Sequence, residues 1–463
     1  MFQSINPATG ETFATHDELS DDALEAKLAA AHAAYAQWRS TPYEERTAIL
    51  TRIADAFDAN KHRLAEMATR EMGKTLASAV AEVEKCVSGF RYYAEHGPAL
   101  LADAEIGTAS GRAVARWLPM GPVLAVMPWN FPYWQVVRFL APTIMAGNVG
   151  LLKHASLTQG CAALIEEMVA EAGAPAGVFQ NLAIGSKRVA PIIADPRIVA
   201  VTLTGSEGAG ASVAEAAGRA LKKVVLELGG SDPFIVMPSA DIAKAAKVAV
   251  TARTQNAGQS CICAKRMIVH ADVYDPFLEA FADGMRGLAV GDPMSDDTAM
   301  GPLSSVEQCD TVIDQVAEAQ AEGATLMFGG EALDRPGAWM SPGILVDVPP
   351  DGDFAKQEIF GPVAMVFRAR DIEEAIRLAN DVPFGLGSSV WTEDAGEQER
   401  FARDVEAGMT AINAMLASVP EAPFGGVKRS GHGRELGPWG LHEFMNLKAV
   451  MLPAGDRSGP SGD

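Results

Sequence analysis

The chain has 463 residues, of which 48% are hydrophobic and 21% are charged, and its formal net charge is −21. This composition is typical of a soluble globular protein with two or three packed units, and it excludes a disordered or fibrous chain. The negative charge argues against nucleic acid or an anionic membrane as a partner, because both attract clustered lysine and arginine.

The beginning of the chain lacks the pattern of a secretory signal, because it is polar and has no apolar segment. No apolar run reaches the roughly 18 residues that cross a bilayer. The longest candidate, 136–149, contains Arg138, Pro142 and Gly147. Five cysteines are too few for a disulfide framework in a chain of this size. We therefore expect a cytoplasmic protein with no membrane segment, and no metal site is predicted.

Helical patterns dominate residues 21–96, and residues 112–119 have the pattern of a short strand. Beyond them, short apolar runs alternate with helical patterns of about 10–15 residues, which indicates βαβ units and a parallel sheet. The same alternation restarts after Gly230. The sequence therefore predicts two α/β domains that meet near residues 229–230.

Cys261 lies where a helical pattern ends in the glycine-containing loop 256–261. Such a loop can present a thiol to a cleft with little steric cover, and a thiolate is a strong nucleophile near neutral pH. The alternative is a small buried side chain with no chemical role, which is common for cysteine.

Glu227 is a lone carboxylate at the end of an apolar strand, and two glycines follow Leu228. Ligands of open α/β sheets bind at the carboxyl ends of strands. Apolar surroundings raise the pKa of a carboxyl group, which suits a general base. A strand-end glutamate that only caps the next helix is the alternative.

Asn130 lies between Pro128 and Pro132, which restrict the backbone on both sides. A side-chain amide held in this way can donate to a developing oxyanion. A rigid aromatic turn in the core is the alternative.

Glycines from Gly205 to Gly210 connect an apolar strand to a helix. Such a turn lets a pyrophosphate approach the helix N-terminus, although the spacing differs from the usual dinucleotide-binding pattern. Lys153 ends another strand, where it could reach a ribose hydroxyl or a phosphate, or simply face solvent.

These motifs, in this order, resemble those of the aldehyde dehydrogenase superfamily over nearly the whole chain. In chain order they are Pro128–Pro132 (PWNFP), Lys153, Thr204–Gly210 (TGSEGAG), Leu226–Gly230 (LELGG), Asn256–Cys261 (NAGQSC), Glu358–Pro362 (EIFGP) and Pro423–Gly431 (PFGGVKRSG). The resemblance implies that Cys261 is the nucleophile and that Glu227 activates the water that releases the acyl group. It also implies that Asn130 and the Cys261 backbone amide form the oxyanion hole.

The resemblance further implies a cofactor cleft in which Glu358 holds the nicotinamide ribose and Phe360 lies beside the ring. The predicted cofactor-binding residues are Met127, Pro128, Trp129, Lys153, Ser156, Gly205, Ser206, Gly210, Leu228, Glu358 and Phe360. Strictly NAD-preferring members often carry a glutamate three residues after the cleft lysine, where it repels a 2′-phosphate, and this chain has Ser156 there. We therefore expect NADP⁺ to be used well, with NAD⁺ as an alternative.

The fold that the resemblance implies is α/β, with a Rossmann-like cofactor domain, an α/β catalytic domain and a small β oligomerisation arm. The expected ranges are 1–98 and 120–229 for the cofactor domain, 230–430 for the catalytic domain, 99–119 and 431–455 for the arm, and 456–463 for a flexible tail. The resemblance implies a homodimer or homotetramer that acts on a small-molecule aldehyde.

Within the family the chain resembles the succinate-semialdehyde dehydrogenases most closely, in segments 151–156, 226–236 and 423–436. This implies that Arg138 binds the substrate carboxylate, for which a guanidinium is the natural partner. Trp134 and Ser418 are expected to line the same pocket. A structural ion pair is the alternative for Arg138. In addition, Gln255 stands where some members have a second arginine.

Cys263 lies two residues after Cys261. Some members of this branch have a cysteine there, and the resemblance implies a reversible disulfide that blocks the nucleophile. A buried cysteine without a redox role is the alternative.

Three other functions stay open. A CoA-acylating dehydrogenase commonly lacks the general-base glutamate, so Glu227 argues against it. A non-catalytic member would not need Cys261, Glu227 and Asn130 together. The same chemistry could also act on glutarate semialdehyde or on an aliphatic or aromatic aldehyde, because single pocket side chains contribute only ~1–3 kcal/mol to such preferences.

Overall fold

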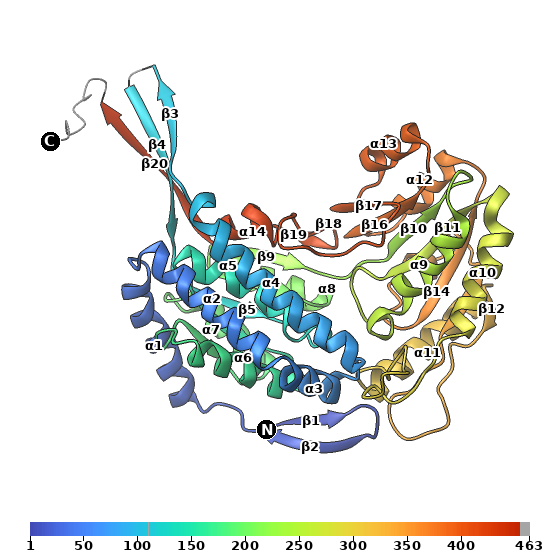
Figure 1. The fold of residues 1–463 in the computed structure, drawn as a ribbon, viewed down its shortest axis with the longest axis horizontal. Coiled ribbons are helices and arrows are strands. Elements are labelled where there is room, and N and C mark those ends of the chain that lie inside the picture. The colour runs from blue at the N-terminus through green and yellow to red at the C-terminus, as the bar shows by residue number, and fades with distance from the viewer. Residues whose placement is uncertain (110, 454–463) are drawn as a thin grey trace.

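A computed structural model describes residues 1–109 and 111–453 of the chain. Two α/β lobes lie side by side, and a three-stranded sheet projects from the first of them (Figure 1). The chain begins with an antiparallel hairpin, β1 (Phe2–Asn6) and β2 (Glu11–His16), which the sequence patterns did not predict. Ser4 of this hairpin is fully buried and donates to the carboxylate of Glu71, so the hairpin is attached to the first lobe.

The first lobe contains a six-stranded sheet with the order β19-β9-β8-β5-β6-β7. Its strands are β5 (Pro122–Val126), β6 (Val149–Lys153), β7 (Phe179–Asn181), β8 (Ala200–Thr204), β9 (Lys223–Glu227) and β19 (Gly431–His432). All are parallel except β19, which runs antiparallel to β9. The parallel strands are mostly runs of buried apolar residues, as expected for a sheet covered by helices on both faces.

The helical pattern predicted for residues 21–96 corresponds to four helices that pack on this lobe. The helices of the first lobe are α1 (Asp21–Trp38), α2 (Tyr43–Ala59), α3 (Lys61–Met72), α4 (Leu76–Leu100), α5 (Trp134–Ala146), η1 (Ser156–Thr158), α6 (Gln159–Glu171), η2 (Ser186–Arg188), α7 (Val189–Ala194), α8 (Glu207–Arg219) and α14 (Gly437–His442). Helix α5 is buried along its whole length, because it lies between the sheet and helices α2 and α4.

The second lobe contains a seven-stranded sheet with the order β12-β13-β14-β11-β10-β16-β17, in which only β12 is antiparallel to its neighbour. Its strands are β10 (Asp232–Val236), β11 (Ala264–His270), β12 (Thr325–Phe328), β13 (Gly343–Val346), β14 (Val363–Ala369), β16 (Gly387–Trp391) and β17 (Met409–Ile412). The chain enters this lobe between β9 and β10. We propose this crossing as the boundary between the two domains.

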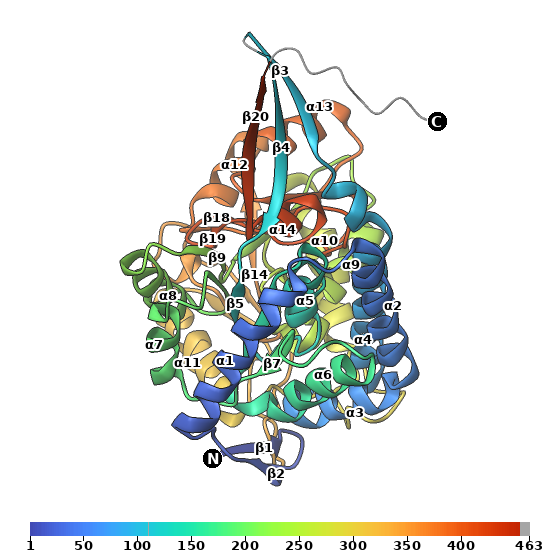
Figure 2. The same ribbon diagram turned by 90° about the vertical axis from the view of Figure 1, so that its left-hand side faces the viewer.

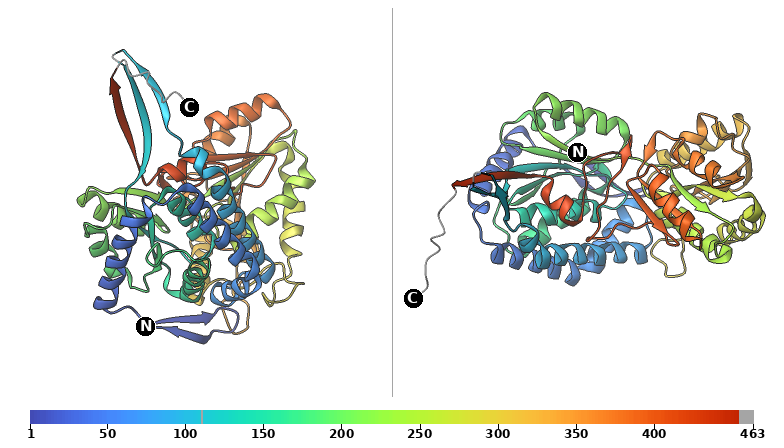
Figure 3. Two further views of the ribbon diagram at one scale, coloured as in Figure 1. Left: turned by 60° about the vertical axis from the view of Figure 1, so that its left-hand side comes forward. Right: turned by 90° about the horizontal axis from the view of Figure 1, so that it is seen from above.

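The helices of the second lobe are α9 (Ile242–Thr254), η3 (Gln255–Gly258), η4 (Ala271–Val273), α10 (Tyr274–Arg286), α11 (Val306–Ala321), η5 (Phe354–Lys356), α12 (Ile372–Asn380) and α13 (Ala395–Asp404). Two short strands, β15 (Phe384–Gly385) and β18 (Val427–Lys428), form an antiparallel pair. After β18 the chain returns to the first lobe, where it forms β19. Seen from above, the two lobes lie next to each other with their sheets in separate halves of the molecule (Figure 3).

The projecting arm consists of β3 (Ala104–Thr108), β4 (Gly111–Pro119) and β20 (Met445–Pro453), with β4 in the centre (Figure 2). The predicted arm range 431–455 is wrong at its start. Residues 431–432 form β19 of the first lobe's sheet, and α14 packs on α5. The C-terminal strand of the arm, β20, therefore begins at Met445. The predicted tail, 456–463, lies outside the described residues.

Among the helices of residues 1–109 and 111–453, none combines the length and the apolar character that a membrane crossing requires.

Candidate active site

The loop that carries Cys261 follows η3, whose backbone is strained. Asn256 and Ala257 have φ values of 53° and 54°, and Gly258 has a φ of 76°. A side chain at Gly258 would clash with the Gly361 carbonyl oxygen. Left-handed backbone at non-glycine residues costs free energy and is often found at functional sites.

Two buried cations hold this loop through its carbonyl groups. Arg253 is fully buried and donates to Gly258 O at 2.9 Å and to Ala264 O at 3.2 Å. Lys265 is also fully buried, and its Nζ donates to Ser260 O at 2.8 Å and to Cys261 O. Arg253 therefore points into the protein, where it stabilises the loop, and does not replace the arginine that is absent at position 255.

The Cys261 thiol is half-buried and faces the cavity between the lobes. Burial raises the pKa of the Cys261 thiol to about 12, although the positive charges of Arg138 and Lys265 act in the opposite direction. Burial thus favours the thiol over the thiolate. These two cations are the groups that would stabilise the thiolate when it forms.

The Glu227 carboxylate faces the same cavity from the end of β9 and is only 2% exposed. Among the described residues, neither of its carboxylate oxygens has a hydrogen-bond partner. Burial and the negative charge of Glu435 raise the pKa of Glu227 well above its usual range, while Arg138 acts against this shift. A carboxyl group in these surroundings can accept a proton near neutral pH, as a general base must.

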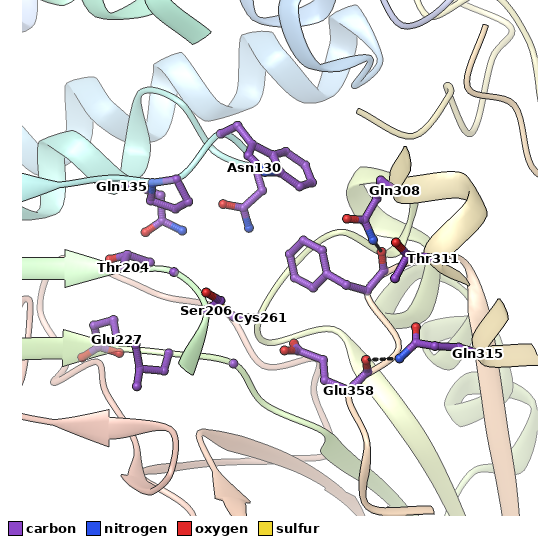
Figure 4. A pocket seen from close by; sticks show the side chains of 16 residues that line it. Asn130, Gln135, Thr204, Ser206, Glu227, Cys261, Gln308, Thr311, Gln315 and Glu358 are labelled. Carbon is purple, nitrogen blue, oxygen red and sulfur yellow. Dashed lines mark hydrogen bonds between the residues drawn. The ribbon is translucent and has the colours of Figure 1, made fainter. Parts of the chain in front are cut away.

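Asn130 is the third residue of this group, and its amide is tied to the Cys261 loop. Its Nδ2 donates to Gln259 O at 3.1 Å, and Asn256 Nδ2 donates to Asn130 O at 2.8 Å. The side chain lines the cavity beside Cys261 and Glu227 (Figure 4). The structure thus brings together the three residues that the sequence analysis selected as catalytic.

The cavity has a volume of about 420 Å³ and extends away from these residues between the two lobes. Its lining includes seven of the predicted cofactor-binding residues, namely Pro128, Trp129, Gly205, Ser206, Leu228, Glu358 and Phe360. The Phe360 ring lies edge-on to Trp129, with ring centroids 5.8 Å apart. Glu358 is held by Lys265, whose Nζ lies 3.1 Å from Glu358 Oε1.

Several polar atoms on the walls of the cavity fit a nucleotide cofactor. Among the described residues, Thr204 Oγ1 is buried without a hydrogen-bond partner. Ser206 caps α8 by accepting from Ala209 N at 3.4 Å, so the N-terminus of this helix opens beside the cavity. A helix N-terminus next to unpaired polar groups is a suitable place for a phosphate.

Four predicted cofactor-binding residues do not line this cavity. Met127 is buried in the core, and its backbone N donates to Lys153 O at 3.0 Å. A side chain at Gly210 would lie 2.6 Å from Leu228 Cδ2, so this glycine allows close packing of α8 on the sheet. Ser156 lies in a second hollow that also contains Trp129, next to Lys153 at the end of β6.

Helix α11 supplies lining residues that the sequence analysis missed. Gln308 Nε2 donates to Phe360 O at 2.9 Å, and Gln315 Nε2 donates to Glu358 O at 3.0 Å. Thr311 lines the cavity between them, opposite Asn130 and Glu227 (Figure 4). The signal in the sequence was a polar stripe at helical spacing, 308, 311 and 315, which looks the same as an ordinary solvent-exposed face.

Arg138 lies outside the lining of this cavity and is already paired. Its Nε is 2.7 Å from Glu435 Oε2, its Nη2 donates to Gln135 Oε1, and its guanidinium stacks over Phe424 at 4.3 Å from the ring centroid. The side chain is only 2% exposed. The structure therefore contains the structural ion pair that the sequence analysis gave as the alternative role of Arg138.

Trp134 and Ser418 contact each other, since Trp134 Nε1 donates to Ser418 Oγ at 2.9 Å. Cys263 is fully buried, and its Sγ lies 3.7 Å from Gln255 O. All five cysteines are free. The regulatory disulfide between Cys261 and Cys263 stays a prediction.

Comparison with known proteins identifies the family. A model of the aldehyde dehydrogenase family matches residues 1–450. The succinate-semialdehyde dehydrogenase NADP(+) 1 of Mycobacterium bovis (strain BCG / Pasteur 1173P2) is 52% identical, covering 97% of this chain and 99% of its own length. The succinate-semialdehyde dehydrogenase NADP(+) of Mycobacterium avium (strain 104) is 51% identical over 99% of this chain and 98% of its own.

Solved structures that are similar to this chain also include succinate-semialdehyde dehydrogenases. The succinic semialdehyde dehydrogenase from Streptococcus pyogenes in complex with NADP+ as the cofactor matches with a TM-score of 0.96 and 41% identity, covering 98% of this chain and 100% of that one. A succinate-semialdehyde dehydrogenase from Burkholderia pseudomallei matches with a TM-score of 0.94 and 36% identity, covering 97% and 94%. The chain belongs to the aldehyde dehydrogenase family, and the predicted family and fold class are confirmed.

Proposed function

We propose that the chain oxidises succinate semialdehyde to succinate with NADP⁺, through a thioester on Cys261. The observation that carries the proposal is the meeting of Cys261, Glu227 and Asn130 at one cavity, in a chain 52% identical to a succinate-semialdehyde dehydrogenase NADP(+). Cys261 provides a nucleophile, Glu227 a base, and Asn130 an amide donor, which is the set that this oxidation needs.

The reaction begins when Cys261 Sγ adds to the aldehyde carbon and the thiol proton leaves through water in the cavity. Asn130 Nδ2 and the Cys261 backbone N–H donate to the oxyanion that forms. When bound, the nicotinamide cofactor supplies the acceptor for the hydride that leaves this carbon. Glu227 then takes a proton from water, and the hydroxide attacks the thioester and breaks its C–S bond. The carboxylic acid is released, and the proton on Glu227 returns to the Cys261 thiolate.

The cofactor would lie between the lobes, with Ser206 and the N-terminus of α8 near its phosphates and Glu358 near a ribose. Ser156 supports the preference for NADP⁺, because a hydroxyl at that position does not repel a 2′-phosphate as a carboxylate would. Lys153 ends the neighbouring strand, half-buried, and offers a positive charge on the same side.

The arm supports a homo-oligomer, either a dimer or a tetramer. Ile106 and Met451 both pair with Ala113 across the sheet, so the two side chains share one face of it. Leu447 lies four residues before Met451 on the same strand and therefore points to the same side. These three side chains are 49%, 65% and 53% exposed, which is unusual for a row of apolar residues.

The test is steady-state kinetics with succinate semialdehyde, glutarate semialdehyde, propanal and benzaldehyde, each with NADP⁺ and NAD⁺. We expect the highest kcat/KM for succinate semialdehyde with NADP⁺. If propanal or benzaldehyde has the highest value, the substrate assignment is wrong although the enzyme class stands. If NAD⁺ gives the higher kcat/KM with every aldehyde, the cofactor assignment is wrong.

A further inference from the structure

A cluster of side chains behind the catalytic loop contains a lysine that the proposed reaction has not used. Lys85, from α4, donates from Nζ to Ser418 Oγ at 2.8 Å. Trp134, the first residue of α5, donates to the same oxygen at 2.9 Å, and the Lys85 ammonium lies 4.8 Å from the centroid of its ring. Three segments far apart in the sequence thus meet at one hydroxyl group.

Some hydrogen-bond donors of this cluster are not used within it, and these donors could bind a carboxylate. A serine hydroxyl has two acceptor positions and one O–H. Lys85 and Trp134 occupy the acceptor positions of Ser418, so its O–H is left to donate. The Lys85 ammonium uses one of its three N–H groups for Ser418 and keeps the others. One carboxylate oxygen could therefore accept from Ser418 and the other from Lys85.

The charge of Lys85 is also uncompensated. Across the part of the chain that the structure describes, no carboxylate forms an ion pair with its Nζ. Glu82, one turn away, is engaged by Lys74 and accepts from Tyr133 N at 2.8 Å. By contrast, the charge of Arg138 is neutralised by Glu435 at 2.7 Å.

The cluster adjoins the cavity through Gln135, which follows Trp134 directly and lines the cavity (Figure 4). Lys85, Trp134 and Ser418 are not themselves among the lining residues. Gln135 also accepts a hydrogen bond from the Arg138 guanidinium. Lys85 also lies within electrostatic reach of Cys261, because the Cys261 thiolate, when it forms, raises the pKa of the lysine. A short aldehyde attached at Cys261 could place its far end in this cluster.

We propose that Lys85, together with Ser418 and Trp134, binds the carboxylate of the substrate, and that Arg138 positions the neighbouring wall. This proposal rests on the proposed function and names the residue that replaces the arginine absent at position 255. It makes Lys85 the specificity-determining cation for an ω-carboxylated aldehyde.

The first experiment compares succinate semialdehyde with butanal, which has four carbons and no carboxylate, on Lys85→Met and Lys85→Arg. We expect Lys85→Met to lower kcat/KM for succinate semialdehyde about 10- to 100-fold, through KM, which is the usual effect of losing a charged hydrogen bond. The kcat/KM for butanal should not change, and Lys85→Arg should restore most of the loss. Lys61→Met, at a half-exposed lysine that begins α3 and pairs with Asp58, is the control.

A binding measurement without turnover supports the kinetics. Titration calorimetry with succinate should give a higher Kd for Lys85→Met than for the wild type or Lys61→Met. Equal losses for butanal and succinate semialdehyde, with unchanged succinate binding, would overturn the proposal. Thermal denaturation of each variant separates this outcome from a folding defect.

The pH dependence provides a further readout that a purely structural lysine would not give. Burial, and then the positive charge of Arg138, lower the pKa of Lys85 to about 8. Cys86 and Glu82 on α4, and Cys261 opposite, act in the other direction. The ammonium is therefore lost as the pH rises through about 8, and KM for succinate semialdehyde should rise there in the wild type. In Lys85→Arg this rise should be absent.

The outcomes also separate this inference from the proposed function. If the wild type does not prefer succinate semialdehyde to butanal, the proposed function fails. If the wild type has this preference and Lys85→Met keeps it, only the role of Lys85 fails.

Discussion

At the scale of single residues, Glu227 controls the second half of the proposed reaction. Its two buried and unpartnered oxygens are placed to take a proton from water. Replacement by glutamine keeps the shape and removes the base. We expect Glu227→Gln to lower kcat about 10²- to 10⁴-fold, the usual contribution of general base catalysis.

The first turnover should survive in this variant, because Cys261 is intact. Stopped-flow absorbance should record a burst of reduced cofactor near one equivalent per active site, followed by very slow turnover. Glu279→Gln, at an exposed position of α10, is the control. A variant with a normal steady-state rate would show that another group activates the water.

The acid limb of the pH profile provides a second prediction. Burial and the charge of Glu435 raise the pKa of Glu227, so the base form is lost as the pH falls through a value above the ordinary ~4.3. Glu435→Gln removes the repelling charge and frees Arg138, and both changes lower the pKa of Glu227. We therefore expect the acid limb of kcat to move to lower pH in this variant. If the acid limb of kcat stays at the same pH in Glu435→Gln, the limb reports the titration of a group other than Glu227.

At the scale of elements, the alternation of apolar runs and helical patterns predicted the two α/β domains and the central strands of their sheets, but not every strand of either sheet. The N-terminal hairpin was missed, because β2 has mostly exposed and half-exposed residues and no strict alternation. The arm boundary was placed too early, because β19 has only two residues, Gly431–His432, and gives no periodicity. Its place depends on pairing with β9, more than 200 residues earlier.

The site residues also divide into those that local sequence predicts and those that only the fold reveals. Cys261, Glu227 and Asn130 could be predicted because each lies in a local motif of glycines, prolines or apolar residues with a chemical reason. The role proposed for Lys85 could not be predicted, because it depends on contact with Ser418, which lies 333 residues away in the sequence. The pairing of Arg138 with Glu435 was likewise hidden, since only the fold brings α5 next to the segment before α14.

Helix α5 carries several pocket residues, and its start depends on a buried glutamate. Glu82 Oε1 accepts from Tyr133 N at 2.8 Å and from Trp134 N at 2.9 Å, and its other oxygen pairs with Lys74. Both members of this pair are buried. Loss of the glutamate charge leaves Lys74 buried without its counter-ion.

We expect Glu82→Gln to lower the free energy of unfolding by about 3–5 kcal/mol, the usual cost of removing one partner from a buried pair. Its Tm and urea midpoint should fall accordingly. Glu84→Gln, at an exposed glutamate two residues on, should cost about 0–1 kcal/mol. Equal Tm values for the two variants would mean that Lys74 finds another partner or loses its charge.

At the scale of the whole molecule, the cavity lies where the two lobes meet. Pro128, Glu227 and Ser206 come from the first lobe, and Gln308 and Phe360 from the second. The chain crosses between β9 and β10, directly after Glu227, so the proposed general base lies at the junction itself. The proposed site therefore needs both lobes in their observed arrangement.

The arm leads to the last prediction. An apolar face exposed on a three-stranded sheet marks an association surface, and a second copy of the same sheet would cover it. We expect Leu447→Glu and Met451→Glu together to shift the protein to a smaller species in size-exclusion chromatography with light scattering. Each side chain is more than half exposed, so the substitutions should not disturb the core of a subunit.

Leu221→Glu is the matched control, because Leu221 is 95% exposed on the first lobe and far from the arm in sequence. The control should keep the mass of the wild type. If the arm variant also keeps that mass, the subunits associate through another surface, and the apolar face of β3, β4 and β20 needs a different explanation. If light scattering shows that the wild type is itself a monomer, the prediction of a homo-oligomer is wrong.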